Sequence, residues 1–282
     1  MISKTVGKID EHKANLCPPM KTNIFTAFIF ETRMEVLGID IGGSGIKGAI
    51  VDTKTGKLTT ERYRIPTPKP STPKAVAQVI KQIKDHFDWH EDIGCTFPSV
   101  VVEGKAKYSS NLDSAWKGVQ IDDLFSECCA DERFCIVNDA DAAGIAEMRF
   151  GVGAHHNAGL VLMITVGTGL GSGAFYDGQL IPNFELGRMY GKDGDLIEFY
   201  AADSARKKED LSFDEWGPRF NFFLKHIERI FTPDHIIIGG GVSKKIHKFR
   251  KHIKIDTPYS VSEKLNNAGI IGAAMNAAEH HK

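Results

Sequence analysis

The sequence predicts an α/β protein built from two similar halves with a cleft between them. Three glycine-rich stretches that each follow a short apolar run carry this prediction: Asp40-Ile41-Gly42-Gly43-Ser44-Gly45, Thr165-Val166-Gly167-Thr168-Gly169 and Ile238-Gly239-Gly240-Gly241. The first two lead directly into another β-rich run, so that each opens a strand-rich half. Because the two halves repeat one order of elements, we expect these turns to face each other across an interdomain cleft.

The first half is expected to start with strands on either side of its glycine turn. Pro73 suits the first turn of a helix whose apolar residues Val76, Val79, Ile80 and Ile83 share one face. Short apolar runs bounded by turn residues supply the strands. We expect strands from Val36 to the turn, over 46–51 and over 57–65, a helix over 73–87, a strand over 93–97, a hairpin over 100–108, a helix over 121–130, a strand over 134–137 and a helix over 140–150.

The second half repeats the strand-turn-strand opening. In its last part, Ile246, Phe249 and Ile253 have helical spacing, and lysines and arginines cover the other positions. We expect strands over 160–166, 174–176 and 179–181, helices over 195–207 and 213–231, a strand over 236–238, a helix from Ser243 and a last helix over 267–278.

Length and composition limit the classes of function. The 282 residues allow one large domain or two moderate ones, and the net charge of −1 gives no global attraction for polyanions. We therefore expect no nucleic-acid partner. No apolar stretch approaches the ~20 residues that span a membrane. An odd number of cysteines without a CxxC pair favours a reducing cytoplasm and argues against a disulfide framework or structural zinc; they are Cys17, Cys95, Cys128, Cys129 and Cys135.

The expected boundaries divide the chain into three parts. Residues 1–33 form a polar leader with Pro18-Pro19, which we expect to be disordered or to reflect a mis-assigned start. An N-terminal α/β domain follows over 34–137 and a C-terminal α/β domain over 138–282. The last helix is in a position to pack back on the first domain.

The first glycine turn suits an anionic phosphate chain with its metal ion. With little side chain at Gly42, Gly43, Ser44 and Gly45, backbone N–H groups can converge on one point. Asp40 can hold a hydrated cation before the turn, and Lys47 can meet a phosphate after it. The stretch is neither a Walker A loop nor a Rossmann fingerprint, because a strand follows it. The alternative is a glycine-rich hairpin with no ligand.

Several motifs together carry a family resemblance. The three glycine turns resemble those of the actin-like, sugar-kinase superfamily, in which two RNase H-like domains flank a cleft. Asn138-Asp139-Ala140-Asp141-Ala142-Ala143 and Glu185-Leu186-Gly187 resemble the ROK family within it. Further stretches narrow the resemblance to the polyphosphate glucokinases; they are Gly45-Ile46-Lys47-Gly48, Asn111-Leu112-Asp113-Ser114-Ala115-Trp116, Glu209-Asp210-Leu211-Ser212, Gly241-Val242-Ser243-Lys244-Lys245 and Leu265-Asn266-Asn267-Ala268-Gly269-Ile270.

The resemblance implies a cytoplasmic, homodimeric enzyme that phosphorylates glucose, with Asp139 as general base and Mg²⁺ held by Asp40 through water. A helix cap at Asn138 or Asp139 is the structural alternative. Asn111 also suits a turn. The implied sugar contacts are Asn111, Asn138, Asp139, Glu185 and Arg188. The implied phosphate contacts are Asp40, Gly42, Gly43, Ser44, Gly45, Lys47, Thr165, Gly167, Thr168, Gly169, Gly239, Gly240, Gly241, Lys244 and Lys245.

The phosphoryl donor is open between polyphosphate and ATP. The one-sided basic segment Ser243–Lys254 suits a long polyphosphate, although charge runs also form ordinary solvated helix faces. Glycines 239–241 leave room for a nucleotide. An ATP-only hexokinase, a sugar-sensing regulator and an inactive scaffold are the other readings.

Two departures from the ROK pattern bear on the sugar. Arg188 stands where the family has a histidine, so a donor-only cation replaces a group that can also accept. The acidic residue expected shortly afterwards is missing, and Tyr190 stands near its place.

Overall fold

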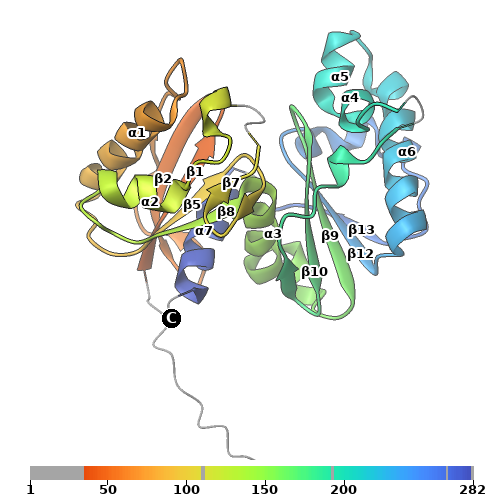
Figure 1. The fold of residues 1–282 in the computed structure, drawn as a ribbon. Coiled ribbons are helices and arrows are strands. Elements are labelled where there is room, and N and C mark those ends of the chain that lie inside the picture. Colours follow the sequence, from red (N-terminus) through yellow and green to blue (C-terminus); the bar gives the residue numbers. More distant parts are fainter. Residues whose placement is uncertain (1–34, 109–111, 192–193, 265, 281–282) are drawn as a thin grey trace, which may run out of the picture. The chain divides into compact units, whose positions relative to one another are not determined.

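Two mixed β-sheets organise the residues that the computed structural model describes, which are 35–108, 112–191, 194–264 and 266–280 (Figure 1). The first sheet has the strand order β3-β2-β1-β5-β8, with β4 also pairing with β2. In it β1 runs antiparallel to β2 and parallel to β5. Its strands are β1 (Glu35–Gly42), β2 (Gly45–Asp52), β3 (Lys57–Leu58), β4 (Tyr63–Ile65), β5 (Ile93–Phe97) and β8 (Phe134–Asn138), and the hairpin β6 (Val101–Val102) and β7 (Lys105–Ala106) lies beside it.

The second sheet repeats the topology of the first. Its order is β11-β10-β9-β12-β13, with β9 antiparallel to β10 and parallel to β12. The two glycine turns that follow β1 and β9 therefore occupy equivalent places, which confirms the predicted duplication. The strands are β9 (Leu160–Val166), β10 (Leu170–Tyr176), β11 (Gln179–Ile181), β12 (His235–Gly239) and β13 (Tyr259–Val261).

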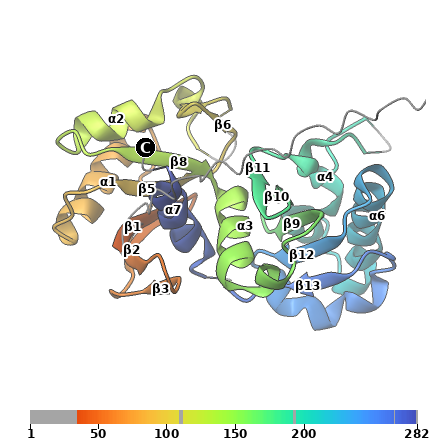
Figure 2. The ribbon, with the colours of Figure 1, turned by 90° about the horizontal axis from the view of Figure 1, so that it is seen from below.

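Helices form layers on both sides of each sheet. Helices α3 and α7 lie between the two sheets (Figures 1 and 2), and one core cluster joins Val36 of β1 and Met163 of β9 with both helices. Helices α1 and α2 cover the outer face of the first sheet, and α6 covers that of the second. The helices are α1 (Pro73–His86), α2 (Ile121–Cys128), α3 (Asp139–Phe150), α4 (Glu198–Ala201), α5 (Asp203–Lys208), α6 (Phe213–Phe231) and α7 (Ala268–Glu279), with short 3₁₀ turns η1 (Ser114–Trp116), η2 (Val152–His155), η3 (Leu186–Arg188), η4 (Ser243–Lys248) and η5 (Arg250–His252).

The last helix packs directly on the backbone of the first sheet. A Cβ at Gly94 of β5 would lie 1.9 Å from the carbonyl oxygen of Ala273, and one at Gly38 of β1 would lie 2.1 Å from that of Ile270. Only glycine fits at such an approach, so these two positions let α7 lie against the strands. The C-terminal segment thus completes the core of the N-terminal sheet.

Three predicted elements differ from the structure. The strand over 57–65 is two short strands, β3 and β4, and the helix over 195–207 breaks at Ala202, whose backbone is extended (ψ 162°). The prediction of an α-helix from Ser243 is wrong. The segment forms the 3₁₀ turns η4 and η5, and the backbone of Lys245 lies outside the helical region (φ −108°, ψ 18°). Its cations would stand four residues apart in an α-helix, and such like-charge pairs are unfavourable there.

The apolar positions of that basic segment still point inward. Phe249 is fully buried and Ile253 is 8% exposed, so they anchor the 3₁₀ turns to the second sheet's core. No helix in the described part of the chain is both long and apolar enough to cross a bilayer. The leader over 1–33 and Asn111 lie outside the described residues, and the domain boundaries stay predictions.

Candidate active site

Asp139 stands where strand β8 passes into helix α3. The preceding residue, Asn138, caps the helix: its side-chain oxygen accepts hydrogen bonds from the backbone N–H groups of Ala140 (2.8 Å) and Asp141 (3.2 Å). The Asn138 amide nitrogen donates to the Ser99 carbonyl (3.1 Å) and to Glu185 (3.3 Å). Asn138 therefore acts as the helix cap and also joins the N-terminal sheet to Glu185, and its contact with a sugar stays a prediction.

A cleft of about 520 Å³ opens beside Asp139 and is lined from both halves of the fold. Its acidic groups are Asp40 and Asp139, and its basic groups come from strand β2, strand β4 and the residue just before β4. Its lining residues are Asp40, Lys47, Arg62, Arg64, Asp139, Ala140, Ala143, Met163, Thr165, Gly240, Gly241, Ser262, Asn266, Ala268 and Gly269. The cleft thus gathers residues that lie more than two hundred positions apart in the sequence.

The electrostatic surroundings raise the pKa of Asp139 to about 7. The side chain is exposed to the cleft, and its partial desolvation by the surrounding protein is the largest cause of the raised pKa. The negative charges of Asp40 and Glu185 raise the pKa further. A carboxylate with a pKa near neutrality is well suited to take a proton from a hydroxyl group.

Asp40 is held by two neighbours in the first sheet. Its Oδ2 is 3.0 Å from the Nζ of Lys47 on the adjacent strand, and its Oδ1 accepts a hydrogen bond from the Thr96 hydroxyl at 2.9 Å. Thr96 Oγ1 in turn accepts from the Ile41 N–H at 3.0 Å. The carboxylate is therefore oriented before any ligand arrives, and 20% of its side chain remains exposed to the cleft.

The predicted phosphate residues fall into two groups. Asp40, Lys47, Thr165, Gly240 and Gly241 line the cleft. Gly240 has a left-handed backbone (φ +79°), and a Cβ there would lie 2.5 Å from the Val166 nitrogen, so the glycine lets the third turn press against the second. The other predicted residues belong to the same turns but do not line this cleft; they are Gly42, Gly43, Ser44, Gly45, Gly167, Thr168, Gly169, Gly239, Lys244 and Lys245.

The two predicted lysines of the third turn lie in different surroundings. Lys244 donates to the Asn266 side chain at 2.7 Å, and Asn266 lines the cleft. Lys245 lies 5.8 Å from the centre of the Phe213 ring, which also faces Lys248 and Arg206. Lys244 therefore reaches the cleft margin through Asn266, whereas Lys245 belongs to a neighbouring basic surface.

The predicted sugar residues Glu185 and Arg188 lie near each other on the second half. Burial and the charge of Glu198 raise the pKa of Glu185, while Arg188 lowers it. The Arg188 guanidinium also stacks over the Tyr108 ring at 4.3 Å. Arg188 thus connects an acidic group of the second half to an aromatic side chain of the first.

Glu198 was missed in the sequence. The motif position near Tyr190 holds no acidic residue, but helix α4 brings the carboxylate of Glu198 close enough to raise the pKa of Glu185. A Cβ at Gly169 would lie 2.6 Å from its Oε2. Glu198 follows Arg188 by ten positions, and only the folded chain brings this carboxylate close to both Glu185 and Gly169 of the second glycine turn.

Comparison with known proteins assigns this chain to a family. The ROK family model matches residues 36–183. The chain belongs to the ROK family. It is 41% identical to the polyphosphate glucokinase of Mycobacterium tuberculosis (strain H37Rv) over 244 residues, covering 86% of this chain and 91% of the relative.

Two crystal structures extend the comparison. The inorganic polyphosphate/ATP-glucomannokinase of Arthrobacter sp. strain KM has a TM-score of 0.83 and 39% identity, with 88% of this chain and all of that chain covered. A ROK family glucokinase from Streptomyces griseus, in complex with glucose and AMPPNP, has a TM-score of 0.73 and 22% identity, with 87% and 99% covered. The second similarity shows the shared fold, which is the predicted actin-like sugar-kinase arrangement.

Asn183 links the two halves of this ROK chain through two hydrogen bonds to Val101, a link called the clasp below. Its side chain accepts from the Val101 N–H at 2.9 Å and donates to the Val101 carbonyl at 2.7 Å, as a neighbouring strand would. Its own N–H donates to Asp141 at 2.8 Å. Asp141 is 1% exposed, and burial is the main cause that raises its pKa to about 7.

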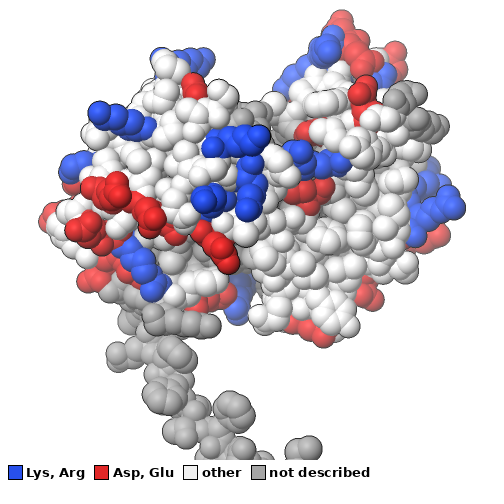
Figure 3. All heavy atoms as spheres, in the orientation of Figure 1, with Lys and Arg blue, Asp and Glu red and all other residues white. Residues whose placement is uncertain are grey.

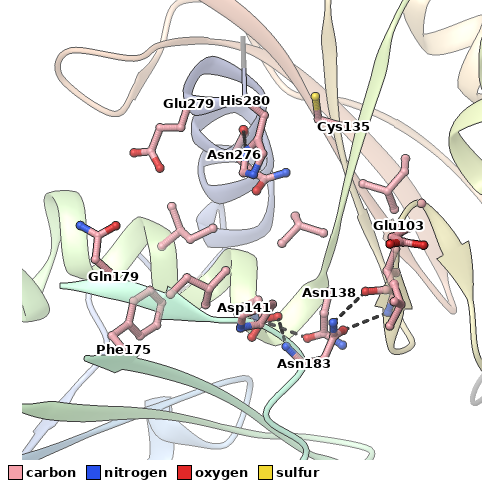
Figure 4. Close-up of a pocket in the computed structure, with 18 of the residues that line it drawn as sticks. Glu103, Cys135, Asn138, Asp141, Phe175, Gln179, Asn183, Asn276, Glu279 and His280 are labelled. Carbon is pink, nitrogen blue, oxygen red and sulfur yellow. Dashed lines mark hydrogen bonds between the residues drawn. The ribbon is translucent and has the colours of Figure 1, made fainter. Parts of the chain in front are cut away.

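The clasp borders a second cavity of about 800 Å³ (Figure 4). Asp141, Asn138 and Asn183 gather at one end of it, and Asn276 and His280 of the C-terminal segment lie across from them. Asp139 and Asp141 therefore face different spaces from the same helical turn. The first turn of α3 connects the cleft at Asp139 to the contact between the two halves.

Proposed function

We propose that this ROK protein transfers a phosphoryl group from inorganic polyphosphate to the 6-hydroxyl of glucose, with ATP as a second donor. The polyphosphate glucokinases and the polyphosphate/ATP-glucomannokinase to which it is similar support this proposal. The observation that carries it is the placement of Asp139, with its raised pKa, in a cleft lined by Asp40 and Lys47 from the first half and by Thr165, Gly240 and Gly241 from the second.

Asp139 is the general base of the proposed reaction. As the bond between sugar O6 and phosphorus forms, the O6 proton passes to the Asp139 carboxylate. The phosphoanhydride bond to the rest of the donor breaks, and the leaving chain is one phosphate shorter. Backbone N–H groups of the turns after β1 and β9 stabilise the charge on the transferred group.

Asp40 fits a water-mediated magnesium site. Mg²⁺ keeps several waters and is usually bound by one or two carboxylates together with substrate phosphates. Asp40 is oriented by Lys47 and Thr96 and partly exposed to the cleft, which suits an outer-shell contact. When bound, the ion would neutralise charge on the donor phosphates.

Asn138, Asp139, Glu185 and Arg188 are the proposed sugar contacts among the described residues, and Asn111 remains a prediction. Asn138 and Glu185 are already joined by a hydrogen bond, so they would present oriented groups to adjacent hydroxyls. We add Glu198, whose carboxylate lies close to Glu185. The homodimer and the cytoplasmic location also remain predictions.

The test measures product formation by the purified full chain. Glucose and Mg²⁺ are incubated with long-chain polyphosphate or with ATP, and glucose 6-phosphate is quantified; mannose serves as the alternative acceptor. The proposal expects product with polyphosphate and, at a separate rate, with ATP. Product with ATP alone would establish an ATP-only hexokinase, and no product with either donor would leave a sugar-binding regulator or scaffold.

A further inference from the structure

A row of charged side chains crosses three neighbouring strands at the cleft. Asp40 of β1 stands opposite Lys47 of β2, and Lys47 stands opposite Arg64 of β4. Residues directly opposite each other on adjacent strands point to the same face, about 5 Å apart. Arg62 is two residues before Arg64 and also lines the cleft. The row therefore leads outward from Asp40 through Lys47 and Arg64 to Arg62.

Arg64 is fixed against the first glycine turn. Its Nη2 donates to the Ser44 carbonyl at 2.7 Å, and a Cβ at Gly45 would lie 2.4 Å from the guanidinium. That bond uses one of the five N–H donors of an arginine. The absence of a side chain at Gly45 thus makes room for a cation immediately beside the turn.

Arg62 lies farther than Arg64 from the first glycine turn, and it shares a hydrogen-bond partner with Lys244 of the other half of the molecule. Arg62 Nη1 donates to the Asn266 carbonyl at 3.3 Å, while Lys244 Nζ donates to the side-chain oxygen of the same asparagine at 2.7 Å. Asn266 itself lines the cleft. A positive charge from each half therefore flanks this side of the opening.

The charge of the two arginines is not neutralised by an ion pair. Lys47 is paired with Asp40, whereas neither Arg62 nor Arg64 forms a salt bridge to a carboxylate within the described residues. Both arginines are exposed. The face drawn in Figure 3 carries basic and acidic side chains interspersed, as the net charge of −1 leads one to expect. Anion binding by this chain therefore depends on local groups such as these.

We propose that Arg64 and Arg62 form a rail that binds the phosphates of a linear polyphosphate behind the group being transferred. The inference rests on the proposed function and adds a donor-binding site on β4. Guanidinium groups pair with phosphate oxygens in bidentate geometry. Arg64, beside the turn, binds a phosphate that every donor has, whereas Arg62 binds a phosphate that only a longer chain supplies. ATP ends in a nucleoside after its third phosphate, so Arg62 favours polyphosphate over ATP.

The experiment compares donors in three single variants of the full chain. Arg64→Gln is expected to raise KM for long polyphosphate, tripolyphosphate and ATP by roughly tenfold, the loss typical of one charged hydrogen bond. Arg62→Gln is expected to raise KM roughly tenfold for long polyphosphate only. Arg229→Gln, an exposed arginine on α6, is the matched control and should leave all donor constants unchanged.

Direct binding separates this proposal from the proposed function. The binding constant K of long polyphosphate is measured without glucose at several salt concentrations. A plot of log K against log salt concentration falls, and each arginine lost is expected to make the slope less steep by roughly 0.7–1. Arg62→Lys should recover most of that slope. An Arg62→Gln variant with unchanged polyphosphate KM and salt slope, or with equal losses for all three donors, would overturn the rail. A wild type that binds polyphosphate through Arg62 but makes no glucose 6-phosphate would overturn only the function.

Discussion

Asp139 owes its proposed role to its neighbours. Most aspartates are ionised well below neutrality, but here desolvation and two nearby carboxylates raise the pKa to about 7. Below this value Asp139 is largely protonated and unable to take a proton from the sugar. We therefore expect kcat/KM for glucose to rise with pH through about 7 and then level off, measured from pH 5 to 9. A profile that is flat below pH 7 would contradict this role.

The same pKa predicts a stability change at Asp139. A carboxylate whose folded-state pKa is raised contributes stability that is fully present below its unfolded value of 3.8 and is lost as pH rises through about 7. Asp139→Asn removes the charge and keeps the shape. We expect the variant to have a higher Tm than the wild type at pH 8 and a similar Tm at pH 4. A lower Tm at pH 8 would mean that the ionised carboxylate stabilises the fold.

At the scale of elements, the Asn183 clasp joins the loop after β11 to the edge strand β6. Asn183 has a left-handed backbone (φ +60°), so Asn183→Ala both breaks the clasp and strains the chain, whereas Asn183→Gly only breaks the clasp. We expect each variant to lose about 2 kcal/mol from the two hydrogen bonds, with Ala losing more.

Kinetic measurements show whether the clasp positions the first turn of α3 for sugar binding or only stabilises the fold. Because the clasp ends on Asp141, in the same helical turn as Asp139, we expect both variants to raise KM for glucose more than KM for the donor. Steady-state kinetics well below each variant's Tm measure this. Unchanged glucose KM in Asn183→Gly would show that the clasp serves only the stability of the fold.

Local sequence signals predicted the regular elements well. Helix α6 has the expected bounds, Phe213–Phe231, and a capping box from Ser212 to Glu215 opens it. The prediction of an α-helix over Ser243–Lys254 failed because Phe249 and Ile253 can be buried by 3₁₀ turns as well as by an α-helix. Apolar spacing identifies the face that packs, but it does not settle the helix type when cations crowd the other positions.

The site residues that could not be predicted from the sequence are those whose position depends on contacts between distant parts of the chain. Asp40, Lys47 and Asp139 stand in or beside recognisable motifs, so their chemistry could be predicted. Arg62 and Arg64 could not, because their place depends on the register of β4 against β2. Glu198 approaches Glu185 only through the path of the chain between η3 and α4.

On the scale of the whole molecule, the duplicated sheets with α3 and α7 between them bring Asp40 of the first half and Thr165 and Gly240 of the second to the cleft beside Asp139. Helix α7 belongs to the end of the chain yet packs on the first sheet through Gly38 and Gly94. Helix α3 starts at Asp139 and packs against α7. Asp139, the proposed base, therefore stands at the start of a helix that packs between the two sheets.

The most direct measurement is the turnover of Asp139→Asn in the full chain, with glucose binding measured separately and Asp123→Asn on α2 as the matched control. We expect Asp139→Asn to lose roughly 10²- to 10⁴-fold in kcat while its glucose Kd stays within a few-fold of wild type, and we expect the control to keep full activity. A folded Asp139→Asn enzyme with kcat within a few-fold of wild type would contradict this expectation.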